Sequence, residues 1–402
     1  MTRSISFLAL VVGMLSVLAA SANAATVSST SMTCRKGEGC FYGVNYTALP
    51  GEANRLTVTI QRNPPGLEPA GPVLVHDDGA PVHAGKGCAA VDTHTARCPE
   101  GETIGFAGLT AELGDGDDTA TVDADGIVRG GAGNDSLTSS RATLSGGPGS
   151  DVLTATGLGM TLRDDDGAQP APDRYVGSPF LNDTLSYLGR KAPIRIDLRA
   201  GTAGEDTFSG IEWAEGGDGD DVLSGTDGPD RLSGEAGSDL LLGLGGDDEL
   251  NGSGLGHRAG DIDRLDGGDG NDTLAGVGGS HFACGNGVDR VYTLDSGALV
   301  RATCEQIDPP GLQLRPQDAA FLSGQACFCK RITYVARAGR TVIGHVSVGN
   351  VPAQLRLNAT GQRLLARQGR LIAAVSIRSL VSARIRTHRS LRVELLSGSR
   401  SG

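Results

Sequence analysis

The hydrophobic positions follow a nine-residue period in the central part of the chain. From Gly216 to Asn251 the sequence divides into four nonamers, each with glycine and aspartate in its first six positions and leucine at its eighth. Several glycines in six residues disfavour a helix, because each costs about 1 kcal/mol relative to alanine, whereas a tight turn accepts glycine at positive φ. The last three residues suit a short strand whose middle side chain points inward. The pattern predicts alternating turns and three-residue strands.

Two such nonamers close one flattened coil of eighteen residues, and successive coils stack. One buried leucine per repeat does not offset the ordering of nine residues, and stacked aspartates add repulsion between like charges. A hard dication removes both problems, because Ca²⁺ binds carboxylate oxygens and the backbone carbonyls that glycine turns leave free. The leucines that form the expected interior ladder are Leu223, Leu232, Leu241, Leu250, Leu265 and Leu274.

Further copies of the nonamer flank this array. They begin at Leu113, Gly130, Gly146, Arg258, Gly267 and Cys284. The pattern resembles the calcium-binding nonapeptide repeat GGxGxDxUx of the RTX or haemolysin-type family, over residues 113–292 with gaps. The resemblance implies an all-β fold, a right-handed parallel β-roll (β-solenoid), with each calcium ion held between successive turns on one side.

The aspartates at the sixth position of the repeat are the candidate Ca²⁺ ligands. Turns on one edge of the roll are eighteen residues apart, so we expect Asp221 to share an ion with the turn of Asp239, and Asp230 with the turn of Asp248. No other cofactor and no catalytic residue is predicted. The candidate ligands are Asp118, Asp135, Asp151, Asp221, Asp230, Asp239, Asp248, Asp263, Asp272 and Asp289.

The early copies are spaced differently. Asp118, Asp135 and Asp151 are separated by 17 and 16 residues, which is close to a full coil. The segments between them, such as residues 139–144, lack the Gly-Asp turn. We therefore expect coils with one calcium-binding edge and one short plain edge, so that Asp135 and Asp151 lie on the same edge.

The rest of the pattern divides the chain into further regions. Runs such as residues 55–60 and 370–377 combine apolar and β-prone residues and predict strands outside the roll. The predicted regions are a signal peptide (1–24), a strand-rich N-terminal segment (25–112), the calcium-binding β-roll (113–304, irregular at 155–215 and dense at 216–293) and a small basic C-terminal β-domain (305–402).

Charge separates this last region from the others. The 402 residues carry a formal net charge of −12, yet residues 305–402 hold 15 Lys and Arg against 4 Asp and Glu. Such an asymmetry indicates different partners for the two parts. We expect the basic domain to bind an anionic cell-wall or surface polymer or to dock on the acidic roll, with a solvated basic face as the alternative. Nucleic acid is not an expected partner because no recognition motif is present.

The N-terminal residues predict export. Arg3 precedes an apolar run from Phe7 to Leu18 and a small-residue site at 22–24, the layout of a secretory signal peptide. This run is short for a bilayer span and no later apolar run reaches about 18 residues, so no transmembrane segment is predicted. A retained N-terminal anchor is the alternative. The expected location is extracellular, with cell-surface association.

Eight cysteines fit an oxidising compartment. Cys327 and Cys329 are separated by one residue and would be strained as a pair. His83 and His94 lie near two further cysteines, but the spacing matches no standard zinc site. Many pairings are open to eight cysteines; the spacing suggests Cys34 with Cys40, Cys88 with Cys98, and Cys284 with Cys304.

Two classes of function follow. The favoured class is a secreted Ca²⁺-binding repeat protein whose Ca²⁺-dependent β-roll is a structural or cell-surface scaffold. The alternative is an exported enzyme, for example a polysaccharide-active hydrolase, that carries the repeats as an appendage. HExxH and G-x-S-x-G motifs are absent from the sequence, and repeat position explains most of the aspartates. No enzyme is therefore predicted.

Overall fold

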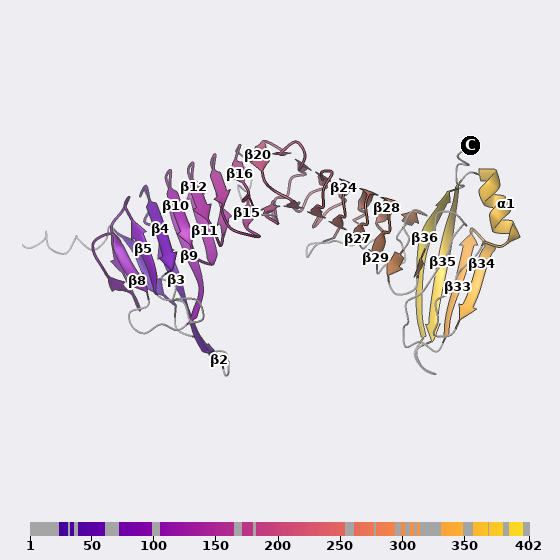
Figure 1. The fold of residues 1–402 in the computed structure, drawn as a ribbon, viewed down its shortest axis with the longest axis horizontal. Coiled ribbons are helices and arrows are strands. Elements are labelled where there is room, and N and C mark those ends of the chain that lie inside the picture. Colours follow the sequence, from indigo (N-terminus) through magenta and orange to yellow (C-terminus); the bar gives the residue numbers. More distant parts are fainter. Residues whose placement is uncertain are drawn as a thin grey trace, which may run out of the picture. The chain divides into compact units, whose positions relative to one another are not determined.

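The structure, a computed structural model, divides the chain into two compact units, Met1–Gly157 and Leu158–Gly402. Both are built mainly of β-strands, which stand in rows in Figure 1. The predicted signal peptide lies, except for Ala24, outside the described residues. These are residues 24–30, 33–35, 39–60, 72–98, 105–164, 171–179, 182–253, 261–276, 279–293, 299–301, 306–308, 312–313, 331–348, 357–368, 370–380 and 386–396.

The strands of the N-terminal unit form two sheets. One has the order β13-β11-β9-β3-β1-β6, with β2 on β3; the other has the order β14-β12-β10-β4-β5-β8-β7. The strands are β1 (Ala25–Ser29), β2 (Thr33–Arg35), β3 (Gly39–Thr47), β4 (Arg55–Ile60), β5 (Val73–Asp77), β6 (Val82–Ala84), β7 (Ala89–Ala90), β8 (Thr95–Cys98), β9 (Gly105–Asp115), β10 (Thr119–Asp123), β11 (Gly126–Ala132), β12 (Ser136–Ser139), β13 (Ala142–Ser145) and β14 (Val152–Ala155).

From β9 onward this unit alternates between its two sheets. The chain passes from β9 in one sheet to β10 in the other and back to β11, and strands of successive coils pair in parallel. Leu137 lies between Ala120 and Leu153 in register, and all three are buried. Antiparallel pairs, β1 with β3 and β4 with β5, complete the sheets at the N-terminal end.

The C-terminal unit begins with a second set of coils. One sheet contains β15, β17, β21, β23, β25, β27, β29, β31 and β32, and the other contains β16, β18 to β20, β22, β24, β26, β28 and β30. Their bounds are β15 (Thr161–Arg163), β16 (Arg174–Val176), β17 (Thr184–Ser186), β18 (Arg195–Asp197), β19 (Thr202–Ala203), β20 (Asp206–Ser209), β21 (Trp213–Glu215), β22 (Val222–Ser224), β23 (Arg231–Ser233), β24 (Leu240–Gly245), β25 (Glu249–Asn251), β26 (Arg264–Asp269), β27 (Thr273–Gly276), β28 (His281–Asn286), β29 (Arg290–Thr293), β30 (Leu299–Arg301), β31 (Gln306–Asp308) and β32 (Leu312–Gln313).

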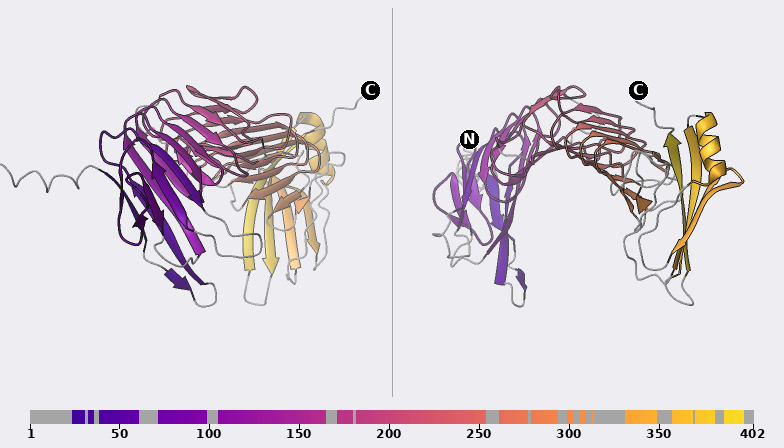
Figure 2. Two further views of the ribbon diagram at one scale, coloured as in Figure 1. Left: turned by 60° about the vertical axis from the view of Figure 1, so that its left-hand side comes forward. Right: turned by 45° about the vertical axis from the view of Figure 1, so that its right-hand side comes forward.

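The interior of these coils is the predicted leucine ladder. Leu223, Leu241 and Leu265 follow one another in register in one sheet. The other sheet has the corresponding row Leu232, Leu250 and Leu274. All six side chains are at most 2 % exposed, so the prediction of one inward residue per strand is confirmed. Figure 2 shows the short strands stacked coil on coil.

The C-terminal residues form an antiparallel sheet and one helix. The strands β33 (Arg331–Ala338), β34 (Thr341–Val348), β35 (Arg370–Leu380) and β36 (Arg386–Leu396) have the order β34-β33-β35-β36. The helix α1 (Ala359–Gln368) lies against β34 and β35, and Oδ1 of Asn358 caps it by accepting the N–H groups of Thr360 and Gly361. The strand expected from the pattern at residues 370–377 is present as part of β35, whereas the sequence pattern did not indicate α1. No helix in the described part of the chain has the length and apolar character needed to cross a bilayer.

Candidate metal centre

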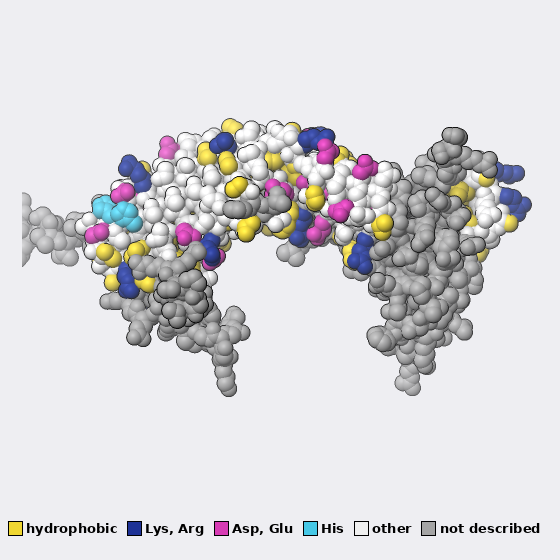
Figure 3. Space-filling model, in the orientation of Figure 1, with side chains coloured by type: hydrophobic (Ala, Val, Ile, Leu, Met, Phe, Trp, Pro, Cys, Tyr) yellow, Lys and Arg dark blue, Asp and Glu magenta, His cyan; other side chains and the backbone are white. Residues whose placement is uncertain are grey.

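The ten aspartates predicted as ligands occupy one kind of position. Each lies at the end of a turn, directly before a strand, and each is at most 5 % exposed. Other acidic residues of the repeats are less buried; Asp220 and Asp247, for example, are exposed. On the face in Figure 3, acidic side chains are accordingly scattered over the described coils and do not gather into a patch. The buried aspartates are therefore structural parts of the turns.

Hydrogen bonds link these aspartates from coil to coil. On one edge of the C-terminal roll, the backbone N–H of Asp221 donates to Oδ1 of Asp239 at 2.8 Å, and that of Asp239 donates to Oδ1 of Asp263 at 3.2 Å. The spacing thus predicted correctly that the turns of Asp221 and Asp239 are neighbours. The opposite edge repeats the arrangement through Asp230, Asp248, Asp272 and Asp289, with three bonds of 2.9 Å.

The N-terminal unit has one such row and one plain edge. The N–H of Asp118 donates to Oδ1 of Asp135 at 2.8 Å, and the N–H of Asp135 donates to Oδ1 of Asp151 at 2.7 Å. On the other side, β12 turns directly into β13, and Oγ of Ser139 accepts the N–H of Ala142 at 2.8 Å. The prediction that Asp135 and Asp151 share an edge is confirmed by the hydrogen bond between them. The opposite edge is plain, since a serine and not an aspartate closes its short turn.

This row begins at a neutral residue. Asn54 precedes β4, which pairs with β10, and its N–H donates to Oδ1 of Asp118 at 2.7 Å. The amide nitrogen of the same side chain lies 3.3 Å from that oxygen. Oδ1 of Asn54 in turn accepts the hydroxyl of Tyr46 at 2.8 Å. An amide thus ends the row without adding another carboxylate.

The second carboxylate oxygen, Oδ2, separates the aspartates into two sets. Oδ2 of Asp221 accepts the N–H of Gly217 at 2.7 Å, and Oδ2 of Asp230 accepts the N–H of Thr226 at 2.5 Å. Buried polar atoms normally have a partner, and one without a protein donor indicates an ion or water. Within the described ranges, no donor reaches Oδ2 of Asp118, Asp135, Asp239, Asp248 or Asp272.

The first glycine of each repeat leaves space for these oxygens. A Cβ atom on Gly243 would lie 2.3 Å from Oδ2 of Asp248 and 2.4 Å from the carbonyl oxygen of Gly267 in the next coil. At Gly267 the corresponding distances are 2.2 Å to Oδ2 of Asp272 and 2.6 Å to the carbonyl oxygen of Cys284. A carboxylate and a carbonyl from the next coil therefore converge on each glycine, where any side chain would displace them.

The donor atoms fit Ca²⁺. Carboxylate and backbone carbonyl oxygens are the ligands that this ion prefers. Over the described residues, no group of three or more His, Cys, Asp or Glu side chains could hold a metal ion. The backbone carbonyls of the glycine turns would therefore supply many of the ligands, with Asp239, Asp248 and their equivalents supplying the charge.

When no cation is bound, burial raises the pKa of these carboxylates. It raises the pKa of Asp239 to about 8 and that of Asp248 to about 7, and neighbouring carboxylates add to the effect. Burial also raises the pKa of Asp118, Asp135 and Asp272 to about 6. A dication beside the carboxylates would favour their charged form.

Three further aspartates occupy the same position but were not predicted. Asp173, Asp183 and Asp206 are buried and directly precede or begin β16, β17 and β20. Each is followed two residues later by a buried apolar or aromatic residue, which was the available signal. Residues 182–185 even repeat the N-D-T-L of residues 271–274. The glycines that mark the other repeats are missing around Asp173 and Asp183, so the nonamer pattern did not reveal these two. Residues 201–209, GTAGEDTFS, keep the glycines at the first and fourth places, the aspartate at the sixth and an aromatic residue at the eighth, so the pattern could have revealed Asp206.

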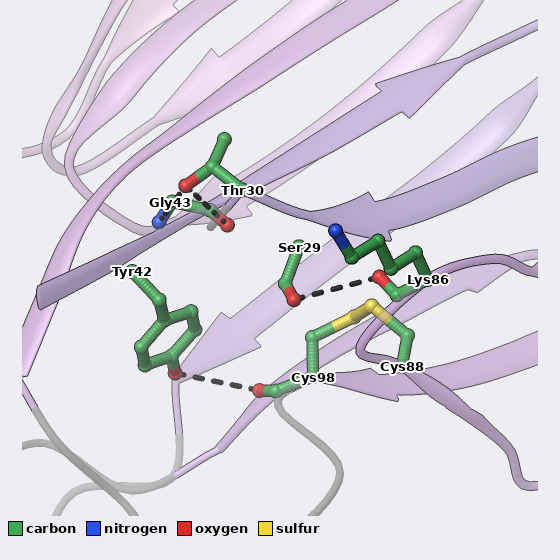
Figure 4. Close-up of a disulfide and its surroundings, with 7 residues drawn as sticks. All are labelled: Ser29, Thr30, Tyr42, Gly43, Lys86, Cys88 and Cys98. Carbon is green, nitrogen blue, oxygen red and sulfur yellow. Dashed lines mark hydrogen bonds between the residues drawn. A yellow bond between two sulfur atoms is a disulfide. The ribbon is translucent and has the colours of Figure 1, made fainter. Parts of the chain in front are cut away.

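The cysteines agree with an oxidised protein where they are described. Cys88 and Cys98 form the predicted disulfide, shown with its surroundings in Figure 4, so their thiols do not form a zinc site. Cys34 and Cys40 are opposite each other in register. Cys284 is disulfide-bonded, while Cys304, Cys327 and Cys329 lie outside the described residues.

Stacked coils with parallel strands, a glycine turn and a buried aspartate before the strand define a β-roll of the calcium-binding repeat class. A family model of the RTX calcium-binding nonapeptide repeat matches four copies, at residues 215–252 and 259–280. The chain thus carries RTX repeats, as its sequence pattern indicated, and is a calcium-binding repeat protein. The rows at Asp118–Asp151 and at Asp289 extend the same geometry beyond the matched residues. No curated protein matches the chain significantly.

Proposed function

We propose that the protein is exported and that its Ca²⁺-dependent β-roll serves as an extracellular or cell-surface scaffold. The observation that carries the proposal is that, among the described residues, no protein donor reaches the buried Oδ2 atoms of Asp239 on one edge and of Asp248 and Asp272 on the other. Buried carboxylates in adjacent coils repel one another unless a cation lies between them. Stacking of the coils therefore depends on the ion.

Calcium concentration would then control folding. At about 1 mM Ca²⁺ and a dissociation constant of about 0.1 mM, each site adds about 1.4 kcal/mol to stability. Several sites in one cooperative stack together are comparable to the whole stability of a small domain, about 5 to 15 kcal/mol. Where calcium is scarce, the dense coils stay largely unfolded and folding follows export. The signal-like residues 1–24 and the Cys88–Cys98 disulfide support this order of events.

The proposal contains no catalytic step, since the buried aspartates of the coils act as structural ligands. The C-terminal domain would instead bind a partner. Four of its arginines, Arg337, Arg340, Arg363 and Arg367, are exposed, and basic side chains gather over α1 in Figure 3. We propose that this surface binds an anionic cell-surface polymer. Retention on immobilised polygalacturonate that decreases with salt, and is lost when the four arginines are changed to glutamine, tests it.

Calcium titration of the purified protein tests the scaffold itself. In EGTA we expect a weak β-sheet signal in circular dichroism, and a cooperative gain when Ca²⁺ is added. Mg²⁺ at the same concentration is the control, because it dehydrates reluctantly and demands near-octahedral geometry. A full β-sheet signal in EGTA, or an equal gain with Mg²⁺, would contradict the proposal.

A further inference from the structure

In one part of the roll, protein groups donate hydrogen bonds to the buried aspartates that link successive coils. We call the described residues between 158 and 215 the arginine–tyrosine block. Asp173 and Asp206 are linked as in the other rows, with the N–H of Asp173 donating to Oδ1 of Asp206 at 2.8 Å. The second carboxylate oxygens, Oδ2, of Asp173 and Asp206 have protein donors, unlike those of Asp239 and Asp248. Oδ2 of Asp206 accepts the hydroxyl of Tyr187 at 2.7 Å, and Oδ2 of Asp173 accepts that of Tyr175 at 2.9 Å.

Both tyrosines are fully buried and are among the largest side chains in the interior. Tyr175 fills the inward position that leucine occupies in the dense array, whereas Tyr187 directly follows β17, in which Leu185 holds that position. The hydroxyls of both tyrosines reach the edge where a cation would otherwise be required. Asp183 is satisfied in another way, because its Oδ2 accepts the backbone N–H of Ser178 at 2.5 Å.

The block also contains its own positive charge. Nη1 of Arg190 lies 3.1 Å from Oδ2 of Asp164, and Nη2 lies 3.2 Å from Oε1 of Glu205. The guanidinium is 5.7 Å from the centre of the Tyr187 ring, and the arginine side chain is only 13 % exposed. A buried guanidinium between two carboxylates supplies locally the charge that a dication supplies elsewhere.

The sheet is also built differently here. β18, β19 and β20 form an antiparallel hairpin series, with Ile196 opposite Ala203 and Thr202 opposite Thr207. β16 pairs directly with β20, and β18 pairs with β22. The hairpin contributes hydrogen bonds that close locally and do not depend on ions between coils.

We infer that the arginine–tyrosine block does not bind calcium and keeps its fold when calcium is removed. It rests on the proposed function only in that the coils from β24 onward are the calcium-dependent ones. Its carboxylates have protein donors, and its arginine would repel a dication. The block therefore presents the formed strands β18 and β21 to the strands β22 and β23, which pair with them. It is a template on which the calcium-dependent coils assemble.

Hydrogen exchange followed by mass spectrometry tests this on the whole protein, in EGTA and in Ca²⁺. Amides of residues 184–187 and 206–209 should exchange at nearly the same rate in both conditions. Amides of residues 240–251 and 264–274 should exchange about tenfold faster or more in EGTA. Equal loss of protection in both regions would overturn the inference while leaving the proposed function intact. The absence of any calcium effect would overturn the proposed function.

Two substitutions sharpen the test. Arg190→Gln should accelerate exchange of residues 184–187 in EGTA by about tenfold, because charged hydrogen bonds are lost from a buried site. Tyr187→Phe keeps the ring, removes one donor from Asp206, and should give a smaller increase in the same peptides. The matched control is Arg231→Gln, since Arg231 lies over the ring of Trp213 at 5.1 Å but is half exposed. Unchanged exchange in both block variants would overturn the assigned role of Arg190.

Discussion

The backbone N–H of Asp230 donates a 2.9 Å hydrogen bond to Oδ1 of Asp248, eighteen residues later and one coil further along the roll. Asp248 donates its own N–H to Asp272 in the same way. One carboxylate oxygen thus holds the preceding coil, and in Asp248 the second is left for a cation. Coil stacking and ion binding therefore depend on the same side chain.

Loss of the Asp248 charge should weaken calcium binding and folding together. Asp248→Asn retains an oxygen that accepts the N–H of Asp230 but removes the charge that holds the ion. We expect the calcium midpoint of the β-sheet signal to rise about tenfold, equivalent to about 1.4 kcal/mol, with fewer ions bound in calorimetry. Asp266→Asn is the control, because Asp266 is exposed on the outer face of β26. Equal midpoints for Asp248→Asn and the unchanged protein would contradict the ligand role.

A methyl group on the first glycine of a repeat should block the same site. In Gly243→Ala the Cβ would lie 2.3 Å from Oδ2 of Asp248 and 2.4 Å from the carbonyl oxygen of Gly267. Both oxygens must move, so we expect a loss of about 2 to 4 kcal/mol in calcium-saturated stability. Gly228→Ala, in the preceding coil on the same edge, is the control, since the nearest atom to its added Cβ, Oγ1 of Thr226, is 3.8 Å away. Denaturant unfolding in Ca²⁺ compares the two; equal losses would show that the approach of the oxygens is not required.

The effect of pH should reverse when calcium is present. Folding raises the pKa of Asp239 to about 8 and of Asp248 to about 7, from about 3.9 in an unfolded chain. The neutral form is therefore favoured by folding, and this stabilisation is complete below about pH 4 and lost as pH rises through 7 to 8. In EGTA, the β-sheet signal should be stronger at pH 5 than at pH 8. In Ca²⁺ it should be at least as strong at pH 8, because the ion binds the charged carboxylates. A signal in EGTA that increases from pH 5 to pH 8 would contradict the burial of these carboxylates.

The coils could be predicted from sequence because their repeat is local. Each nonamer contains a turn, an aspartate and an inward leucine at fixed places. The pairing of coils therefore follows from counting residues, as the neighbours Asp221 and Asp239 show. The arginine–tyrosine block could not be predicted in this way. Tyr187 and Asp206 are nineteen residues apart and meet only because a hairpin intervenes. Such a pair is not part of any repeating sequence pattern, and neither is the ion pair of Arg190 with Glu205.

The same local logic identifies strained positions in the repeat, since Glu235 (φ 68°) and Leu244 both occupy the second place of a nonamer with a positive φ. Leu244 has a φ of 74° at the second place of its nonamer, where Gly131 and Gly268 have φ values of 106° and 99°. A leucine is disfavoured in this region of φ, whereas glycine adopts it freely. The side chain is 41 % exposed, so little packing is lost on its removal.

Leu244→Gly should therefore stabilise the calcium-loaded roll. The relief of backbone strain, about 1 to 3 kcal/mol, exceeds the roughly 0.4 to 1 kcal/mol by which glycine increases the freedom of the unfolded chain. We expect a gain of about 1 kcal/mol in thermal or denaturant unfolding at saturating Ca²⁺. Leu242→Gly, two residues earlier in β24 and without a positive φ, is the matched control and should destabilise. If both substitutions lower the stability, the leucine contributes more through its contacts than its backbone conformation costs.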